Sequence, residues 1–174
     1  MKSTNRLASI GVILLVGLTI PIGAWAAEVT SAGQPPSFND FPAPADESMP
    51  LTVRLILQSR LARHYKTMIE IQAKAEADFA GHYRVATWGC GTDCRGFAII
   101  NKLDGRVYTL PGVQYVAGVM GNDEDRLSYR KDSRLFVMTG RKNDEQEGKF
   151  YYVWDGKALK LVCTSPVEKD RLDE

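Results

Sequence analysis

Short apolar stretches separated by turn-forming residues occupy the chain from Gly81 almost to its end. Runs of this kind, bounded by Gly, Pro, Asn and Asp, are typical of β-strands. An Asp-Gly pair separates adjacent runs at Asp104-Gly105 and at Asp155-Gly156, and such pairs supply the positive φ angles of a type I′ hairpin turn. The sequence therefore predicts an antiparallel sheet with strands at His82–Trp88, Gly96–Asn101, Arg106–Leu110, Gln114–Val119, Leu127–Tyr129, Leu135–Thr139, Phe150–Trp154 and Ala158–Cys163.

Two of these strands carry a burial signal. All residues of Phe97–Ile100 are apolar, which indicates a central strand covered on both faces. In the last strand Lys160 alternates with Leu159, Leu161 and Cys163, so the side chain of Cys163 is expected to face inward.

One segment before the strands has the pattern of an amphipathic helix. No Gly or Pro occurs from Ser59 to about Ala77, and Ser59 is a suitable N-cap. Residues 53–57 either extend this helix backwards or form a short strand. The expected fold is α+β, with an N-terminal helix packed on an antiparallel β-meander of about six to eight strands. Apolar or amphipathic side chains recur at helical spacing at Leu61, Tyr65, Met68, Ile69 and Gln72.

The charges of this helix run against its dipole. Basic residues come early, at Arg54, Arg60, Arg63 and Lys66, and acidic residues come late, from Glu70 onward. A contact between the basic half and an anionic partner accounts for this order, but ordinary solvation of an exposed face is the simpler explanation.

The start of the chain has the features of a secretory signal peptide. Lys2 and Arg6 precede the apolar stretch Ile10–Ile22, and Ala24-Trp25-Ala26 supplies small residues at the cleavage positions. The apolar stretch is too short to span a bilayer comfortably, since about 20 residues are needed. We therefore expect residues 1–26 to be removed after Ala26, and the protein to be periplasmic or secreted.

The rest of the chain divides into three parts. Residues 27–50 contain five of the eight prolines and are expected to form an extended linker. Residues 51–165 form a single α+β domain, and 166–174 form a charged C-terminal tail. Without Lys2 and Arg6 the chain has 20 basic and 21 acidic residues, a net charge of 20 − 21 = −1. This charge argues against nucleic acid or an anionic membrane as a partner. Removal of the apolar stretch with the signal peptide predicts no stable membrane insertion after cleavage.

Chemically distinctive residues concentrate in 79–95, which combines Phe79-Ala80-Gly81-His82-Tyr83 with Trp88-Gly89-Cys90-Gly91-Thr92-Asp93-Cys94-Arg95. On these residues the chain resembles a family of small exported bacterial proteins with an F-A-G-H-Y…W-G-C-G-x-x-C signature. The resemblance implies export and the extent of the domain, and it transfers no catalytic residue.

The cysteines allow three interpretations. A disulfide between Cys90 and Cys94 would close a three-residue hairpin loop and leave Cys163 a free, buried thiol, with a bond from either cysteine to Cys163 as the alternative. A thiol-dependent or Cys/His enzyme would use Cys90 or Cys94 with His82 as base. A zinc site would use all three cysteines with His82. We favour the Cys90–Cys94 disulfide, with no metal and no cofactor.

A binding module is the function that follows from this interpretation. A rigid, disulfide-closed loop at 88–95 has little conformational freedom to lose on binding, and Trp and Arg are common anchors of interfaces. The candidate binding residues are Trp88, Asp93, Arg95 and His82. The expected partner is an envelope protein or a small ligand, and a Cys/His enzyme of the cell envelope is the alternative.

Overall fold

The computed structural model describes residues 34–44, 53–118 and 126–167, all of which belong to one compact unit, Ser31–Glu174. The expected signal peptide, both ends of the expected linker and all but two residues of the expected tail lie outside the described residues. In chain order the elements are η1 (Phe38–Asp40), β1 (Ile56–Leu57), α1 (Arg60–His64), α2 (Lys66–Gln72), β2 (Tyr83–Gly89), β3 (Cys94–Asn101), β4 (Arg106–Tyr108), β5 (Val116–Ala117), β6 (Leu127–Tyr129), β7 (Leu135–Lys142), β8 (Gln146–Trp154) and β9 (Leu159–Ser165).

The strands hydrogen-bond in the order β1-β4-β3-β5-β7-β8-β9, with β2 paired to β3 and β6 paired to β7. This arrangement confirms the sheet-rich fold. A purely antiparallel meander of six to eight strands is wrong, because the described residues form nine strands and β1 pairs in parallel with β4. The reason is local: residues 53–57 contain a strand rather than a turn of helix, and the Ile56 amide donates to the Gly105 carbonyl at 2.8 Å.

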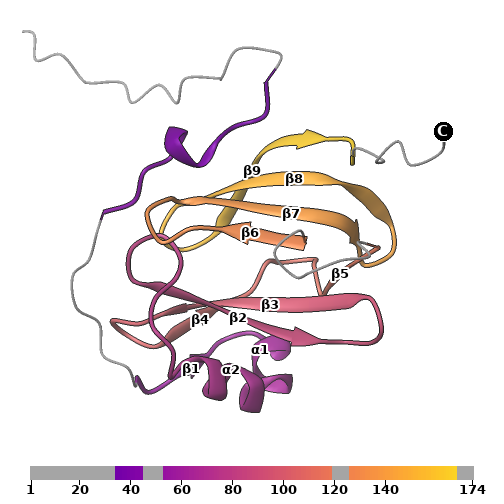
Figure 1. Cartoon of the computed structure of the whole chain (residues 1–174). Helices are drawn as coiled ribbons and strands as arrows, with labels where there is room; N and C mark the ends of the chain where they lie inside the picture. Colours follow the sequence, from indigo (N-terminus) through magenta and orange to yellow (C-terminus); the bar gives the residue numbers. More distant parts are fainter. Residues whose placement is uncertain (1–33, 45–52, 119–125, 168–174) are drawn as a thin grey trace, which may run out of the picture. The chain divides into compact units, whose positions relative to one another are not determined.

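The sheet forms two layers that β5 connects. One end of β3 pairs with β5 through Cys94 and Arg95, and β5 in turn pairs with the end of β7 through Arg141 and Lys142. In Figure 1 the layer of β2, β3 and β4 therefore lies opposite the layer of β6, β7, β8 and β9. Strand β5 thus links the two layers by hydrogen bonds, and the inner faces of the layers are buried against each other.

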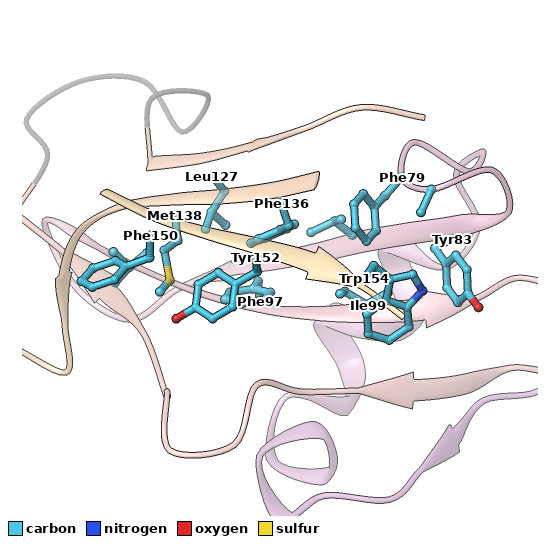
Figure 2. Close-up of a cluster of buried hydrophobic side chains, with 13 residues drawn as sticks. Phe79, Tyr83, Phe97, Ile99, Leu127, Phe136, Met138, Phe150, Tyr152 and Trp154 are labelled. Carbon is cyan, nitrogen blue, oxygen red and sulfur yellow. The ribbon is translucent and has the colours of Figure 1, made fainter. Parts of the chain in front are cut away.

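An aromatic core fills the space between the layers. Figure 2 shows its buried side chains, with Phe97 and Ile99 of β3 facing Phe136 of β7 and Tyr152 and Trp154 of β8. The Phe97 and Phe136 rings stack with centroids 4.9 Å apart. The intervening residues of β3, Ala98 and Ile100, are buried in a second cluster with the helices. Strand β3 is thus covered on both faces, as the run Phe97–Ile100 predicts.

The helical segment is shorter and more broken than its sequence pattern indicates. Ser59 is the N-cap, and its hydroxyl accepts from the Ala62 amide at 3.0 Å. The expected continuous helix to Ala77 is wrong, because Tyr65, with φ −99° and ψ 24°, separates α1 from α2. The Tyr65 ring stacks on Trp88 of β2 with centroids 4.4 Å apart, so tertiary packing overrides helical propensity here. Neither described α-helix is long and apolar enough to cross a membrane.

Side chains from the sheet satisfy the backbone at the end of α2. The Lys102 side chain is fully buried, and its Nζ donates to the carbonyls of Ala73 and, at 2.9 Å, Ala75. Burial, with Arg84 as a second cause, lowers the pKa of Lys102 below its usual value. In the opposite direction, Gln72 of α2 accepts from the Thr87 amide at 3.1 Å and donates to its carbonyl. The Gln72 bonds attach α2 to β2, and the Lys102 bonds attach the residues that follow α2 to the turn after β3.

Replacing Lys102 by methionine is expected to lower the free energy of unfolding by about 2 kcal/mol, because two carbonyls lose a charged donor. Lys74→Met provides the control, since Lys74 is exposed on the same segment, and it should change stability by less than about 0.5 kcal/mol. Urea unfolding followed by circular dichroism measures both variants. Equal midpoints for the two variants would show that the Lys102 contacts do not contribute.

Part of the expected linker packs on the domain. Residues 34–44 include η1, and Phe38 and Phe41 pack against the outer face of β7 and β8. The Ser133 hydroxyl donates to the Phe38 carbonyl at 2.7 Å and also contacts the Phe41 carbonyl at 3.0 Å. These described residues of the expected linker therefore contact the domain, and the two phenylalanines pack against the buried cluster of Leu135, Val137 and Tyr151.

Hairpins occur at both Asp-Gly pairs, but neither is a type I′ turn. Only the glycines have positive φ there, 75° at Gly105 and 93° at Gly156. The hairpin between β7 and β8 does have two consecutive positive φ angles, 50° at Asn143 and 62° at Asp144. At Asp155 the backbone amides of Lys157 and Ala158 donate to the carboxylate, and these bonds lower its pKa.

Candidate functional site

The end of the β2–β3 hairpin, residues 88–95, forms a closed and exposed loop that we call the tip. Gly89 pairs with Arg95 at the last register position of the hairpin. Beyond it Cys90 and Cys94 form a disulfide with Cα atoms 5.3 Å apart, and the Cys90 amide donates to the Cys94 carbonyl at 3.4 Å. Residues 89–92 are exposed. The structure thus pairs Cys90 with Cys94, the pairing that the sequence favours, and leaves Cys163 outside the bond.

Asp93 attaches the tip to the rest of the domain. Its Oδ1 accepts from Arg126 Nη2 at 2.6 Å, and its Oδ2 accepts from the Gly118 amide at 2.9 Å. The Arg126 side chain is 4% exposed, whereas that of Asp93 is 33% exposed. A buried guanidinium needs a compensating charge, and the Asp93 carboxylate supplies it while fixing the tip to residues outside the hairpin. Asp93 thus has a structural partner as well as a position in the predicted binding loop.

Trp88, the first residue of the tip, lies at its buried base rather than on its surface. It is 3% exposed, and its indole lies between Tyr65 and the backbone of Gly96, its partner across the two strands. A Cβ atom at Gly96 would overlap the indole ring. The expectation that Trp88 contacts a partner directly is therefore wrong, because both faces of the β2–β3 layer are covered. Its role is to support the base of the tip.

Arg95 lies along the side of the tip and is half-buried. Its Nη1 donates to the Cys94 carbonyl at 3.2 Å. The absence of a side chain at Gly89 makes room for it, since a Cβ there would lie 3.3 Å from Arg95 Nη1. The guanidinium is thus held against the loop, where it places a positive charge beside the exposed backbone.

His82 lies at the other end of β2 from the cysteines. Seven strand residues separate the two sites, which at the usual rise per residue corresponds to about 25 Å. The Phe79–Tyr83 half of the signature forms a separate turn, in which Phe79 and Tyr83 exchange backbone hydrogen bonds at 3.0 and 2.9 Å. A general base must lie within hydrogen-bond reach of its nucleophile. The structure therefore does not bring His82 together with Cys90 or Cys94.

Cys163 lies on β9, opposite Tyr151, and is a free, half-buried thiol packed against the cluster on the outer face of β7 and β8. The strict alternation expected for this strand is wrong. An irregularity between Tyr151 and Tyr152 shifts the register, and Leu161 is 52% exposed on this last strand of the sheet. Within the described ranges, no group of three or more His, Cys, Asp or Glu side chains has the arrangement of a metal site.

Arg126 and Gly96 are the two positions at the tip that the sequence does not reveal. Arg126 is 33 residues from Asp93 and comes from a polar stretch that resembles any solvated loop. Gly96 lies inside a predicted strand, where an isolated glycine signals the close approach of another group. That signal identifies the position but not the indole that occupies it.

The comparisons with known proteins do not extend this picture. No protein-family model matches the chain, and neither does any curated protein or solved structure. The resemblance of residues 79–101 to small exported bacterial proteins stays a prediction. The function is accordingly inferred from the geometry of the tip.

Proposed function

We propose that this protein is an exported binding module that acts in the periplasm or outside the cell after cleavage at Ala26. The tip is its contact surface for an envelope protein or a small ligand. A disulfide suits this location, because such bonds persist in oxidising compartments. An α+β domain, with α1 and α2 covering the β2–β3 layer, acts as the scaffold for the tip.

The observation that carries the proposal is that two separate sets of bonds fix an exposed loop in place. The disulfide closes the tip across its base, and Asp93 fixes it to Arg126 and to the Gly118 amide. A loop ordered before binding loses little conformational entropy on association, so more of the contact energy appears as affinity.

The exposed chemistry of the tip defines the kind of contact it makes. Residues 89–92 offer backbone amide and carbonyl groups with small side chains, the Thr92 hydroxyl lies in the middle, and the Arg95 guanidinium lies beside them. Small side chains allow the partner to approach the backbone closely. We therefore expect a partner surface that combines hydrogen-bond acceptors with a negative charge.

Site-specific photo-cross-linking in the intact cell envelope tests this proposal. A photoreactive residue at Thr92 should yield a discrete cross-linked species, and its yield should fall at least about fivefold on Arg95→Ala, since charged hydrogen bonds contribute about 1.5–3 kcal/mol. The same photoreactive residue at Lys157, in the exposed turn after β8, is the matched control. Identical products from Thr92 and Lys157 would show that the tip is not the contact surface.

A further inference from the structure

We propose that a second site, separate from the tip, binds a single-chain anionic amphiphile, meaning an aliphatic chain with a carboxylate or phosphate head. The site is a groove of about 550 Å³ between residues 53–57 and α2. Its size lies within the usual range of small-molecule sites, about 300–1,000 Å³. The groove borders β1, which is the last strand in the order of the sheet, so no further described strand covers it there.

The floor of the groove is aliphatic. It is formed on one side by Val53, Leu55 and Leu57 and on the other side by Ala73. The three larger side chains are half-buried, so each keeps apolar surface accessible to a ligand. None of the described residues that line the groove is aromatic, so it lacks the stacking surface that nucleobases use. An alkyl chain is the ligand group that matches such a floor.

The rim of the groove is cationic. Arg54, Lys66 and Lys74 line it together with one acidic residue, Glu70. Among the described residues, Lys66 is the only one of the three with an ion-pair partner, Glu70, at 3.5 Å across one helical turn. The charged residues that line the groove therefore have a net charge of 3 − 1 = +2, which attracts an anionic head group to the edge of the aliphatic floor.

This basicity is concentrated in one segment. Residues 53–74 contain five Lys or Arg and one Glu, a local charge of 5 − 1 = +4, whereas the chain without residues 1–26 has a net charge of −1. The remaining residues of the chain without 1–26 thus have a net charge of −1 − 4 = −5. Beside the groove, but not among the residues that line it, β1 and α2 also expose Ile56 (46%) and Ile71 (57%). The reversed charge order of the helix is explained if this segment meets an anion with an apolar portion.

Calorimetric titration of the full chain with dodecanoate, below its micelle concentration, tests the proposal. We expect saturable one-to-one binding, at least tenfold weaker for Lys66→Glu combined with Lys74→Glu. Lys131→Glu combined with Lys157→Glu is the matched control and should leave the affinity unchanged, because both lysines are exposed and lie outside the groove. Equal affinity for the two double variants, or for dodecyltrimethylammonium and dodecanoate, would overturn the proposal.

Chain length separates groove binding from simple surface charge. Each methylene buried in the floor should tighten binding by about fourfold, so dodecanoate should bind far more tightly than octanoate. Sedimentation with phosphatidylglycerol vesicles then distinguishes a free amphiphile from a lipid bilayer. Affinity independent of chain length, or vesicle binding without binding of monomeric dodecanoate, would contradict the proposed site.

Discussion

Replacing Gly96 by alanine is expected to lower the free energy of unfolding by about 3 kcal/mol, a large effect for the addition of one methyl group. The added Cβ would occupy the position of the Trp88 indole. The indole cannot move away, because it is buried and stacked on Tyr65. Overpacking of a filled core costs about 1–3 kcal/mol, and a clash with a ring held on its other face belongs at the upper end. Urea unfolding with an unchanged m-value measures the loss.

Gly89→Ala is the matched control, because Gly89 lies on the adjacent strand and its new Cβ would meet only the flexible end of Arg95, at 3.3 Å. We expect this variant to lose less than about 1 kcal/mol. Trp88→Phe in the Gly96→Ala background should recover part of the loss, since the smaller ring leaves room for the methyl group. Similar losses for the two alanine variants would contradict the packing described at the base of the tip.

Replacing Asp93 by alanine is expected to destabilise the protein by about 2–3 kcal/mol. The substitution removes the carboxylate that compensates Arg126, whose side chain is 4% exposed. Breaking a buried pair from one side costs about 3–5 kcal/mol, and the partial exposure of Asp93 reduces that value. Asp93→Asn should lose about half as much, because the amide oxygen still accepts one hydrogen bond.

A second substitution identifies the cause of this loss. In the Asp93→Ala background, Arg126→Met removes the buried guanidinium that has lost this carboxylate, and the double variant should be more stable than Asp93→Ala alone. Denaturant unfolding of the four proteins in the cycle gives the coupling energy. A coupling energy near zero would mean that Arg126 does not depend on Asp93.

Periodicity predicts the strands of this fold because they have ordinary burial patterns. The run Phe97–Ile100 faces the aromatic core on one side and the helices on the other, so four apolar residues in succession are required. The Ser59 cap is equally local, since it needs only an amide three residues away. Features determined within a few residues are therefore visible in the sequence.

The departures from the sequence predictions arise from contacts between distant segments. Tyr65 interrupts the helix and stacks on Trp88, and no residue near Tyr65 in the sequence indicates that the Trp88 indole lies there. Phe38 and Phe41 lie in a proline-rich stretch that resembles a linker, yet they cover a sheet face formed some 95 residues later. In both cases tertiary burial of an aromatic ring outweighs local propensity.

In the candidate site, too, locally determined features are predictable and contacts between distant segments are not. The Cys90–Cys94 pair is predictable because the bond closes a short hairpin loop. The strand pattern does not decide between a buried and an exposed Trp88, since both faces of β2 mix apolar with polar residues and nothing in the pattern identifies which face the helices cover. His82 and the cysteines are close in sequence but lie at opposite ends of one strand, because extended backbone separates residues quickly.

The order of the tip is the claim on which the proposed function depends, and nitrogen-15 relaxation of its backbone amides measures it most directly. We predict order parameters at Gly91 and Thr92 near 0.85, the value of rigid backbone, and a fall below about 0.6 when Cys90→Ser is combined with Cys94→Ser. The strand amides should be unchanged in that variant. Order parameters below about 0.6 at Gly91 and Thr92 in the oxidised, unsubstituted protein would contradict a preorganised binding loop.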